Sequence, residues 1–112
     1  MLKRMNGRDI LMHAADLIEA RGHAKKILHA ANGSLCFNGA ILTALGAELD
    51  EYSRFNYQTD ENQSKVGRIT SYVMPFLKEH PVNWNNRPER TKEEVVAKMR
   101  ELAVTVPELE LV

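Results

Sequence analysis

The sequence predicts a mainly α-helical fold, a compact bundle of about four helices with a minor β-hairpin. Two segments combine an apolar stripe at helical spacing with a recognisable cap, and an Asn-Gly pair lies between short apolar stretches. The chain has 112 residues, which suits a single domain over residues 1–112. No apolar stretch approaches the ~20 residues that a membrane-spanning helix needs.

The first helix is expected from Gly7 to Arg21. Asn6 can cap its N-terminus, where Asp9 faces the positive end of the helix dipole. Gly22 is placed to end the helix in the left-handed conformation. The apolar stripe that predicts its buried face consists of Ile10, Leu11, Ala14, Ala15, Leu17 and Ile18.

The next segment favours a hairpin at Asn32-Gly33, because Asn and Gly both tolerate the positive φ of a two-residue turn. Its arms would be Ile27 to Ala30 and Leu35 to Phe37, paired as short strands or as an extended pair. Asn38 is then expected to cap a short helix from Gly39 to about Leu45.

In residues 50–64, approximately, the apolar residues follow neither the helical nor the alternating spacing, so this segment is predicted to be a polar linker. A longer helix is expected from about Gln63 to Glu79, with a buried face formed by Val66, Ile69, Val73, Phe76 and Leu77. Pro75 lies inside this helix, where its ring clashes with the carbonyl four residues earlier, so a kink or break is expected.

The stretch from Val82 to Arg90 reads as a loop, and the last helix is expected to start at Thr91. Thr91 and Glu94 have the spacing of a capping box, in which each side chain bonds the other residue's backbone N–H. The helix should end near Ala103 to Val106 because Pro107 cannot continue it. Residues 107–112 are expected to form a loose tail or a short added strand.

The composition excludes some functions. Fifteen basic residues balance fifteen acidic ones, so the chain lacks the overall field that attracts nucleic acid or an anionic membrane. Cys36 is the single cysteine, so no intrachain disulfide can form, which suits a reducing compartment. We therefore expect a cytoplasmic protein without a cofactor.

Two sets of residues could support catalysis. Asp9, His13 and Asp16 lie on one face of the first helix and could bind a metal, and Cys36 could act as a nucleophile with His29 as its base. The simpler interpretation makes the first set a solvated helix face and Cys36 a small buried apolar residue. We favour it, and predict neither a metal site nor an enzyme.

Two sets of residues could bind a partner. The unusual stretch around Trp84, Asn85, Arg87 and Arg90 is the candidate interaction site, because Trp and Arg dominate interface hot spots. A single Trp in a small domain more often fills the core, and a buried Trp84 would exclude this site. A local basic excess could instead contact nucleic acid, and its residues are Arg4, Arg8, Arg21, Lys25 and Lys26.

Three runs resemble a family of uncharacterised small proteins of actinobacteria and their phages: Ala14 to Gly22, Gly33 to Ile41, and Trp84-Asn85 followed by Arg90 to Val95. Members often have an aromatic residue and an aspartate where this chain has His23 and Asn86. The resemblance implies a phage or actinobacterial accessory protein. By analogy with other small phage proteins, and because no catalytic set converges, we expect a non-enzymatic, phage-encoded protein that binds a host protein. The alternatives are a small DNA-binding regulator, an enzyme using Cys36 or Asp9/His13, and, as partner, a second copy of the chain.

Overall fold

The structure is a computed structural model that describes residues 6–46, 48–49, 55–56 and 60–105. The protein is mainly α-helical, as predicted. Among the described residues, none of the helices has the length and apolar character needed to cross a membrane. The elements in chain order are α1 (Gly7–Arg21), α2 (Phe37–Ala44), β1 (Glu48–Leu49), β2 (Phe55–Asn56), α3 (Asp60–Leu77), α4 (Pro81–Asn85) and α5 (Lys92–Thr105).

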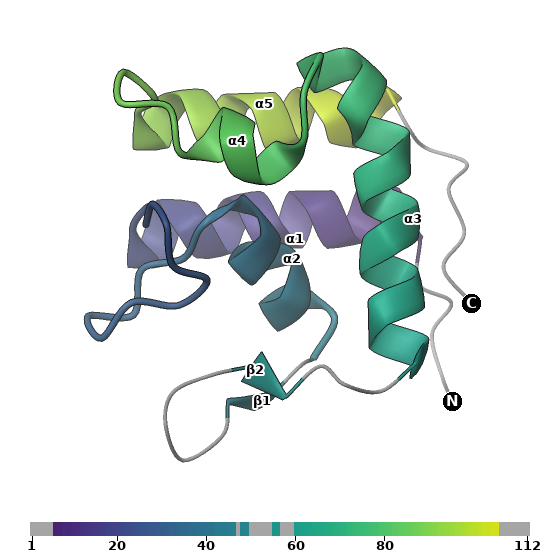
Figure 1. The fold of residues 1–112 in the computed structure, drawn as a ribbon, viewed down its shortest axis with the longest axis horizontal. Helices are drawn as coiled ribbons and strands as arrows, with labels where there is room; N and C mark the ends of the chain where they lie inside the picture. Colours follow the sequence, from purple (N-terminus) through teal and green to yellow (C-terminus); the bar gives the residue numbers. More distant parts are fainter. Residues whose placement is uncertain (1–5, 47, 50–54, 57–59, 106–112) are drawn as a thin grey trace.

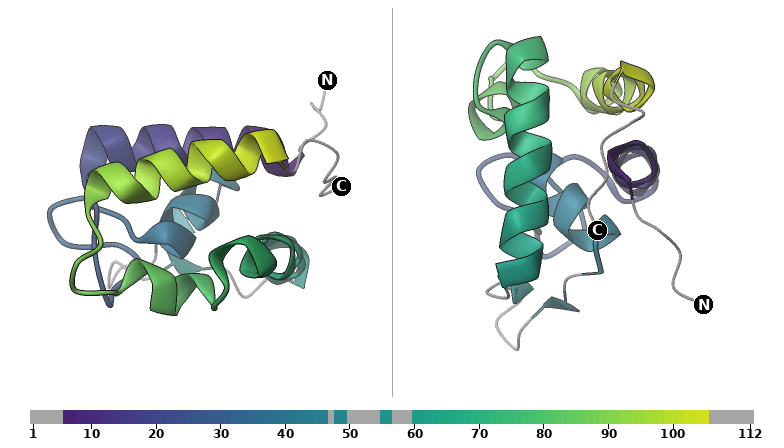
Figure 2. Two further views of the ribbon diagram at one scale, coloured as in Figure 1. Left: turned by 90° about the horizontal axis from the view of Figure 1, so that it is seen from above. Right: turned by 90° about the vertical axis from the view of Figure 1, so that its right-hand side faces the viewer.

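The first and last helices form the main layer. α1 and α5 lie side by side and run in opposite directions, and α3 crosses the bundle at one end (Figures 1 and 2). α2 packs against α1, and α4 contacts both α2 and α3. The buried apolar side chains of all five helices join in one core, whose most enclosed members include Leu11, Ile18, Phe37, Ile41, Ile69, Met99 and Leu102.

The prediction for α1 is confirmed in its bounds, its cap and its buried face. Asn6 Oδ1 accepts a hydrogen bond from Asp9 N at 2.8 Å. Gly22 has the expected positive φ of 104°, but its ψ of 165° is not that of a left-handed helical residue. The reason is that the Gly22 carbonyl accepts from Leu35 N at 3.0 Å, which requires an extended exit from the helix.

The turn at Asn32-Gly33 is present, and its arms form the expected extended pair but not regular strands: Ala30 N donates to Ser34 O at 2.9 Å, and Cys36 N to Leu28 O at 3.3 Å. Gly33 N donates to Ala30 O at 2.9 Å, and a single antiparallel bridge joins His29 to Leu35. The two-stranded sheet of the described residues lies later in the chain, where Glu48 pairs with Asn56 and Leu49 with Phe55.

The predicted first arm also lies over α2. The carbonyl of Leu28 passes so close to Gly39 that a Cβ at this position would clash with it. α2 begins at Phe37, two residues earlier than predicted, and Cys36 rather than Asn38 caps it: Cys36 Sγ accepts from Gly39 N at 3.3 Å. The helix closes as predicted before Gly46, whose φ is 88°.

Helix α3 starts at Asp60, so residues 60–64 of the predicted linker are helical. Pro75 lies inside the helix, and the last turn bends away from the axis of the preceding turns (Figures 1 and 2). Ile69, Val73 and Leu77 are buried as expected, whereas Phe76 is 48% exposed and does not join the core. Residues 50–54 and 57–59 of the predicted linker, and the tail 107–112, lie outside the described residues.

The loop predicted over residues 82–90 is helical in its first part. Pro81 does not merely end the preceding segment but opens α4, with His80 as its cap, because proline fits the first helical position, where no N–H is needed. The capping box of α5 is confirmed, with Glu94 N donating to Thr91 Oγ1 at 3.2 Å and Thr91 N to Glu94 Oε1 at 3.3 Å.

Candidate functional site

Asn85 is the most connected polar side chain of the described core. It is 1% exposed. Its Oδ1 accepts from Phe37 N at 3.0 Å and from His23 Nε2 at 2.8 Å. Its Nδ2 donates to Ala24 O at 3.1 Å and to Asn86 Oδ1 at 3.0 Å. The two acceptor sites of Oδ1 and the two N–H groups of Nδ2 are therefore all used. These hydrogen bonds fix the loop after α1 and the start of α2 against α4.

Trp84 and Arg90, two of the other predicted interaction residues, are also part of this framework. Trp84 is 6% exposed, and its ring meets that of Phe37 edge-on, with the centroids 6.0 Å apart. The Arg90 guanidinium lies 3.9 Å from the centroid of the Trp84 ring, and its Nε donates to Trp84 O at 3.0 Å. Arg87 is exposed, but its guanidinium binds both carboxylate oxygens of Glu79. An exposed Trp84 anchor, as the interaction hypothesis required, is therefore a wrong expectation.

The basic residues proposed for nucleic acid are largely engaged or dispersed. Arg21 donates to Gly33 O at 2.9 Å and contacts His29 Nε2 at 2.7 Å. Lys25 Nζ donates to Arg87 O and Pro88 O, at 2.7 and 3.0 Å. Arg8 lies in the first turn of α1, about 20 Å along the helix from Arg21, and Arg4 lies outside the described residues.

The two candidate catalytic sets have ordinary roles in the described structure. Cys36 is buried and uses its sulfur to cap α2. Burial raises the pKa of its thiol, although the nearby backbone N–H groups of Gly39 and Asn38 act in the opposite direction. A protonated thiol is a poor nucleophile at neutral pH.

The acidic and histidine face of α1 is exposed, and Asp16 and Glu19 both bind Arg100 of α5, at 3.1 and 3.0 Å. Asp9 and His13 do not assemble with further ligands: over residues 6–46, 48–49, 55–56 and 60–105, no group of three or more His, Cys, Asp or Glu side chains could hold a metal ion.

The loop between α1 and α2 is pinned in a strained shape beside α4. Lys26 has a φ of 64°, which is uncommon for a residue with a side chain. Its N–H donates to Asn86 Oδ1 at 2.8 Å, and the Nζ of Lys25 is held by the loop after α4. These contacts fix the next residue, Ile27, with 52% of its surface exposed.

Two adjoining hollows, which we call the Asn38 cleft, lie beneath this loop. One has a volume of about 330 Å³, and the other about 310 Å³; Leu28 and Asn38 line both. The first is lined by Lys26, Ile27, Leu28, Cys36, Asn38, Val82, Asn85 and Asn86. The second is lined by Leu28, Asn38, Leu42, Val66, Gly67, Thr70 and His80.

The Asn38 cleft has an apolar rim, and asparagine side chains form part of its lining. Val82, on α4, is 40% exposed and lines the first hollow with Ile27. Sequence reasoning missed these residues, because three chain segments that are distant in the sequence meet here. The one local signal that could have indicated the cleft is Pro81, because a proline at this position begins the helix that carries Val82.

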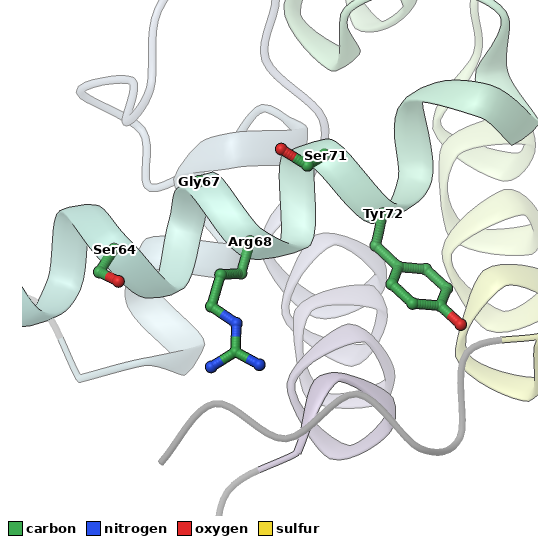
Figure 3. A pocket seen from close by; sticks show the side chains of 5 residues that line it. All are labelled: Ser64, Gly67, Arg68, Ser71 and Tyr72. Carbon is green, nitrogen blue, oxygen red and sulfur yellow. The ribbon is translucent and has the colours of Figure 1, made fainter.

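A further hollow, of about 530 Å³, lies on the outer face of α3 (Figure 3). It owes its shape to the small residues Ser64, Gly67 and Ser71, and the side chains of Arg68 and Tyr72 flank it. It is more open than the Asn38 cleft, and all of its described lining residues belong to a single helix.

Comparison with known proteins gives a family but no function. No curated protein and no solved structure matches the chain. The model of a family of unknown function, DUF6197, matches residues 4–105. The chain therefore belongs to the DUF6197 family.

Proposed function

We propose that this protein is a non-enzymatic accessory protein that acts by binding another protein through the surface around Ile27 and Val82. The observation that carries the proposal is the pinned loop of residues 25–28, which presents an apolar side chain to solvent beside a hollow with an apolar rim. A fixed shape lowers the entropy lost on association, so such a loop favours binding.

The strain in this loop supports the same proposal. A lysine at positive φ costs stability, and such residues persist where the surroundings enforce them, often at functional sites. Here the hydrogen bonds of Lys25 and Lys26 to the segment after α4 enforce the conformation. These contacts hold Ile27 away from the core, where burial would otherwise favour it.

The proposal carries over the resemblance to phage and actinobacterial proteins as its biological setting. The partner would then be a host protein in the cytoplasm. This setting rests on the sequence resemblance alone, whereas the binding surface rests on the exposure of Ile27 and Val82.

Affinity purification tests the proposal. A tagged copy, expressed in the organism that encodes it, should retain a partner in stoichiometric amount. The Ile27→Asp and Val82→Asp variants should each lose at least nine-tenths of it, because a carboxylate would be buried in an apolar contact. Met12→Asp is the matched control, since Met12 is a 39% exposed apolar residue of α1 that does not line the cleft.

The circular dichroism spectra of all three variants should match that of the unchanged protein, so that a lost partner reports on the surface and not on unfolding. Retention of the partner by both cleft variants, or loss of it in Met12→Asp alone, would contradict the proposed surface. Recovery of chaperones only would contradict protein binding altogether.

A further inference from the structure

Asn38, which lines both hollows of the cleft, has an unsatisfied polar group. Its Oδ1 is covered and has no hydrogen-bond partner among the described residues. Buried polar groups in folded proteins nearly always have such a partner, so an exception invites an explanation. Because the side chain lines both hollows, a half-turn about its Cβ–Cγ bond, which exchanges the oxygen with the amide nitrogen, would turn this oxygen toward a bound N–H group.

The charged side chain that lines the cleft is basic, and it is that of Lys26. Lys26 and His80 line the two hollows, and none of the described lining residues is Asp or Glu. The ammonium group of Lys26 forms no ion pair or hydrogen bond within the described part of the chain, and Lys26 is exposed. The cleft thus offers an unpaired cation next to the apolar rim of Ile27 and Val82, which is complementary to a carboxylate attached to an apolar group.

The size of the cleft limits the ligand. A volume of about 330 Å³ lies at the small end of the range for ligand pockets. It suits a single large apolar side chain together with its own backbone groups.

We propose that the Asn38 cleft binds the C-terminal residue of a partner polypeptide, one with an apolar side chain such as leucine. The side chain occupies the hollow between Ile27, Leu28 and Val82. The terminal carboxylate pairs with Lys26, and the peptide N–H donates to Asn38 Oδ1. Capture of a chain terminus is a known mode of peptide recognition. This inference rests on the proposed function, of which it names the ligand.

The first test titrates N-acetyl-leucine into ¹⁵N-labelled protein and follows the amide signals of Lys26, Asn38 and Val82 by NMR. This probe carries the carboxylate, the N–H and the apolar side chain together. N-acetyl-leucinamide lacks the carboxylate, and 4-methylpentanoate lacks the N–H. We expect saturable shifts at these residues with N-acetyl-leucine and at least fivefold weaker binding of the other two compounds.

Two substitutions with matched controls identify the residues. Lys26→Met should weaken the binding of N-acetyl-leucine at least fivefold, whereas Lys78→Met should not change it. Lys78 is a close control because it is also an exposed lysine with a φ of 64° and does not line the cleft. Asn38→Leu should abolish the preference for N-acetyl-leucine over 4-methylpentanoate.

Asn38→Leu also has a readout that separates binding from structure. Removal of an unsatisfied buried oxygen should leave the urea midpoint of unfolding unchanged or higher. A lower midpoint would show that Asn38 has a structural partner and would overturn its assignment to the ligand. Equal binding of N-acetyl-leucine and its amide would overturn the assignment of Lys26, and absence of shifts at the cleft would overturn the site.

A pentapeptide ending in leucine distinguishes a polypeptide from a free small molecule. It should bind at least as tightly as N-acetyl-leucine when its C-terminus is free, and at least fivefold more weakly when its C-terminus is an amide. Exclusion of the pentapeptide by a cleft that still binds N-acetyl-leucine would overturn the choice of a polypeptide. If no probe binds but Ile27→Asp and Val82→Asp still lose a protein partner, this inference fails while the proposed function stands.

Discussion

The Asn85→Ala variant should lose a large part of the stability of the fold. The substitution removes the side chain that binds the backbone of both Phe37 and Ala24. Phe37 is 0% and Ala24 7% exposed, so water cannot easily replace the lost hydrogen bonds. The imidazole of His23 loses its partner at the same time.

The size of the stability loss follows from the number of buried backbone groups that lose their hydrogen-bond partner. A buried donor or acceptor without a partner costs ~1–3 kcal/mol, and two backbone groups give about 2–6 kcal/mol. Alanine is a better helix former than asparagine by roughly 0.5 kcal/mol, which offsets a small part of this loss in α4. The free energy of unfolding should therefore fall by about 2–5 kcal/mol, out of the ~5–15 kcal/mol that is typical of such domains.

Urea unfolding measures this change. Trp84 is the single tryptophan and is buried, so its fluorescence reports on the core beside the substitution, and circular dichroism reports on all the helices. Asn83→Ala is the matched control, because Asn83 is an exposed asparagine of the same helix, and it should change stability by less than about 0.5 kcal/mol.

A loss below about 1 kcal/mol in Asn85→Ala would refute the reasoning, since it would mean that water or a shifted backbone satisfies the stranded groups. If this variant does not fold at all, His23→Ala provides the milder test. It removes one of the four hydrogen bonds of Asn85 and leaves the two backbone contacts intact.

Three further predictions follow from the buried groups and the glycines. Cys36 should react with a thiol reagent at pH 8 at least a hundredfold more slowly in the native protein than in urea, because it is buried and its pKa is raised; equal rates would show that the site is open. Burial, reinforced by two nearby cations, lowers the pKa of His23 below its usual 6.5, so the unfolded chain binds more protons below about pH 6.5 and stability falls there. The His23→Gln variant should lose less stability between pH 7 and pH 5 than the unchanged protein, in urea titrations at both pH values. Gly39→Ala should lower the urea midpoint strongly because its Cβ would clash with Leu28, whereas Gly67→Ala, with open space around it, should gain up to about 1 kcal/mol; similar midpoints for the two variants would contradict the close crossing at Gly39.

The features that the sequence predicted best are those that depend on residues close together in the chain. The bounds of α1 and the capping box at Thr91 follow from side chains within one helical turn, and the structure confirms them. The start of α2 was misplaced because the sulfur of Cys36, an unusual cap, occupies the position expected for the amide of Asn38. Trp84 was misassigned because the partner that buries it, Phe37, is far away in the sequence.

The cleft could not be predicted for the same reason. Its rim combines Ile27 and Val82, which come from segments on either side of α2 and α3. Local patterns indicate whether each segment is helical, but they do not say which segments meet. Asn38 illustrates the limit: the sequence suggested an N-cap, whereas the structure places its oxygen, without a partner, beside the two hollows.

The pairing of α1 with α5 has a consequence for the chain during its synthesis. The apolar face of α1 is covered largely by the last helix, so it cannot be completed while the intervening segment, residues 22–91, is still being made. At the usual rates of translation this interval lasts about 4–14 s. During it, Ile10, Leu11 and Ile18 lack the cover that α5 gives them, and a ribosome-associated chaperone has time to bind them. Closure of this core therefore has to wait until α5 has been made.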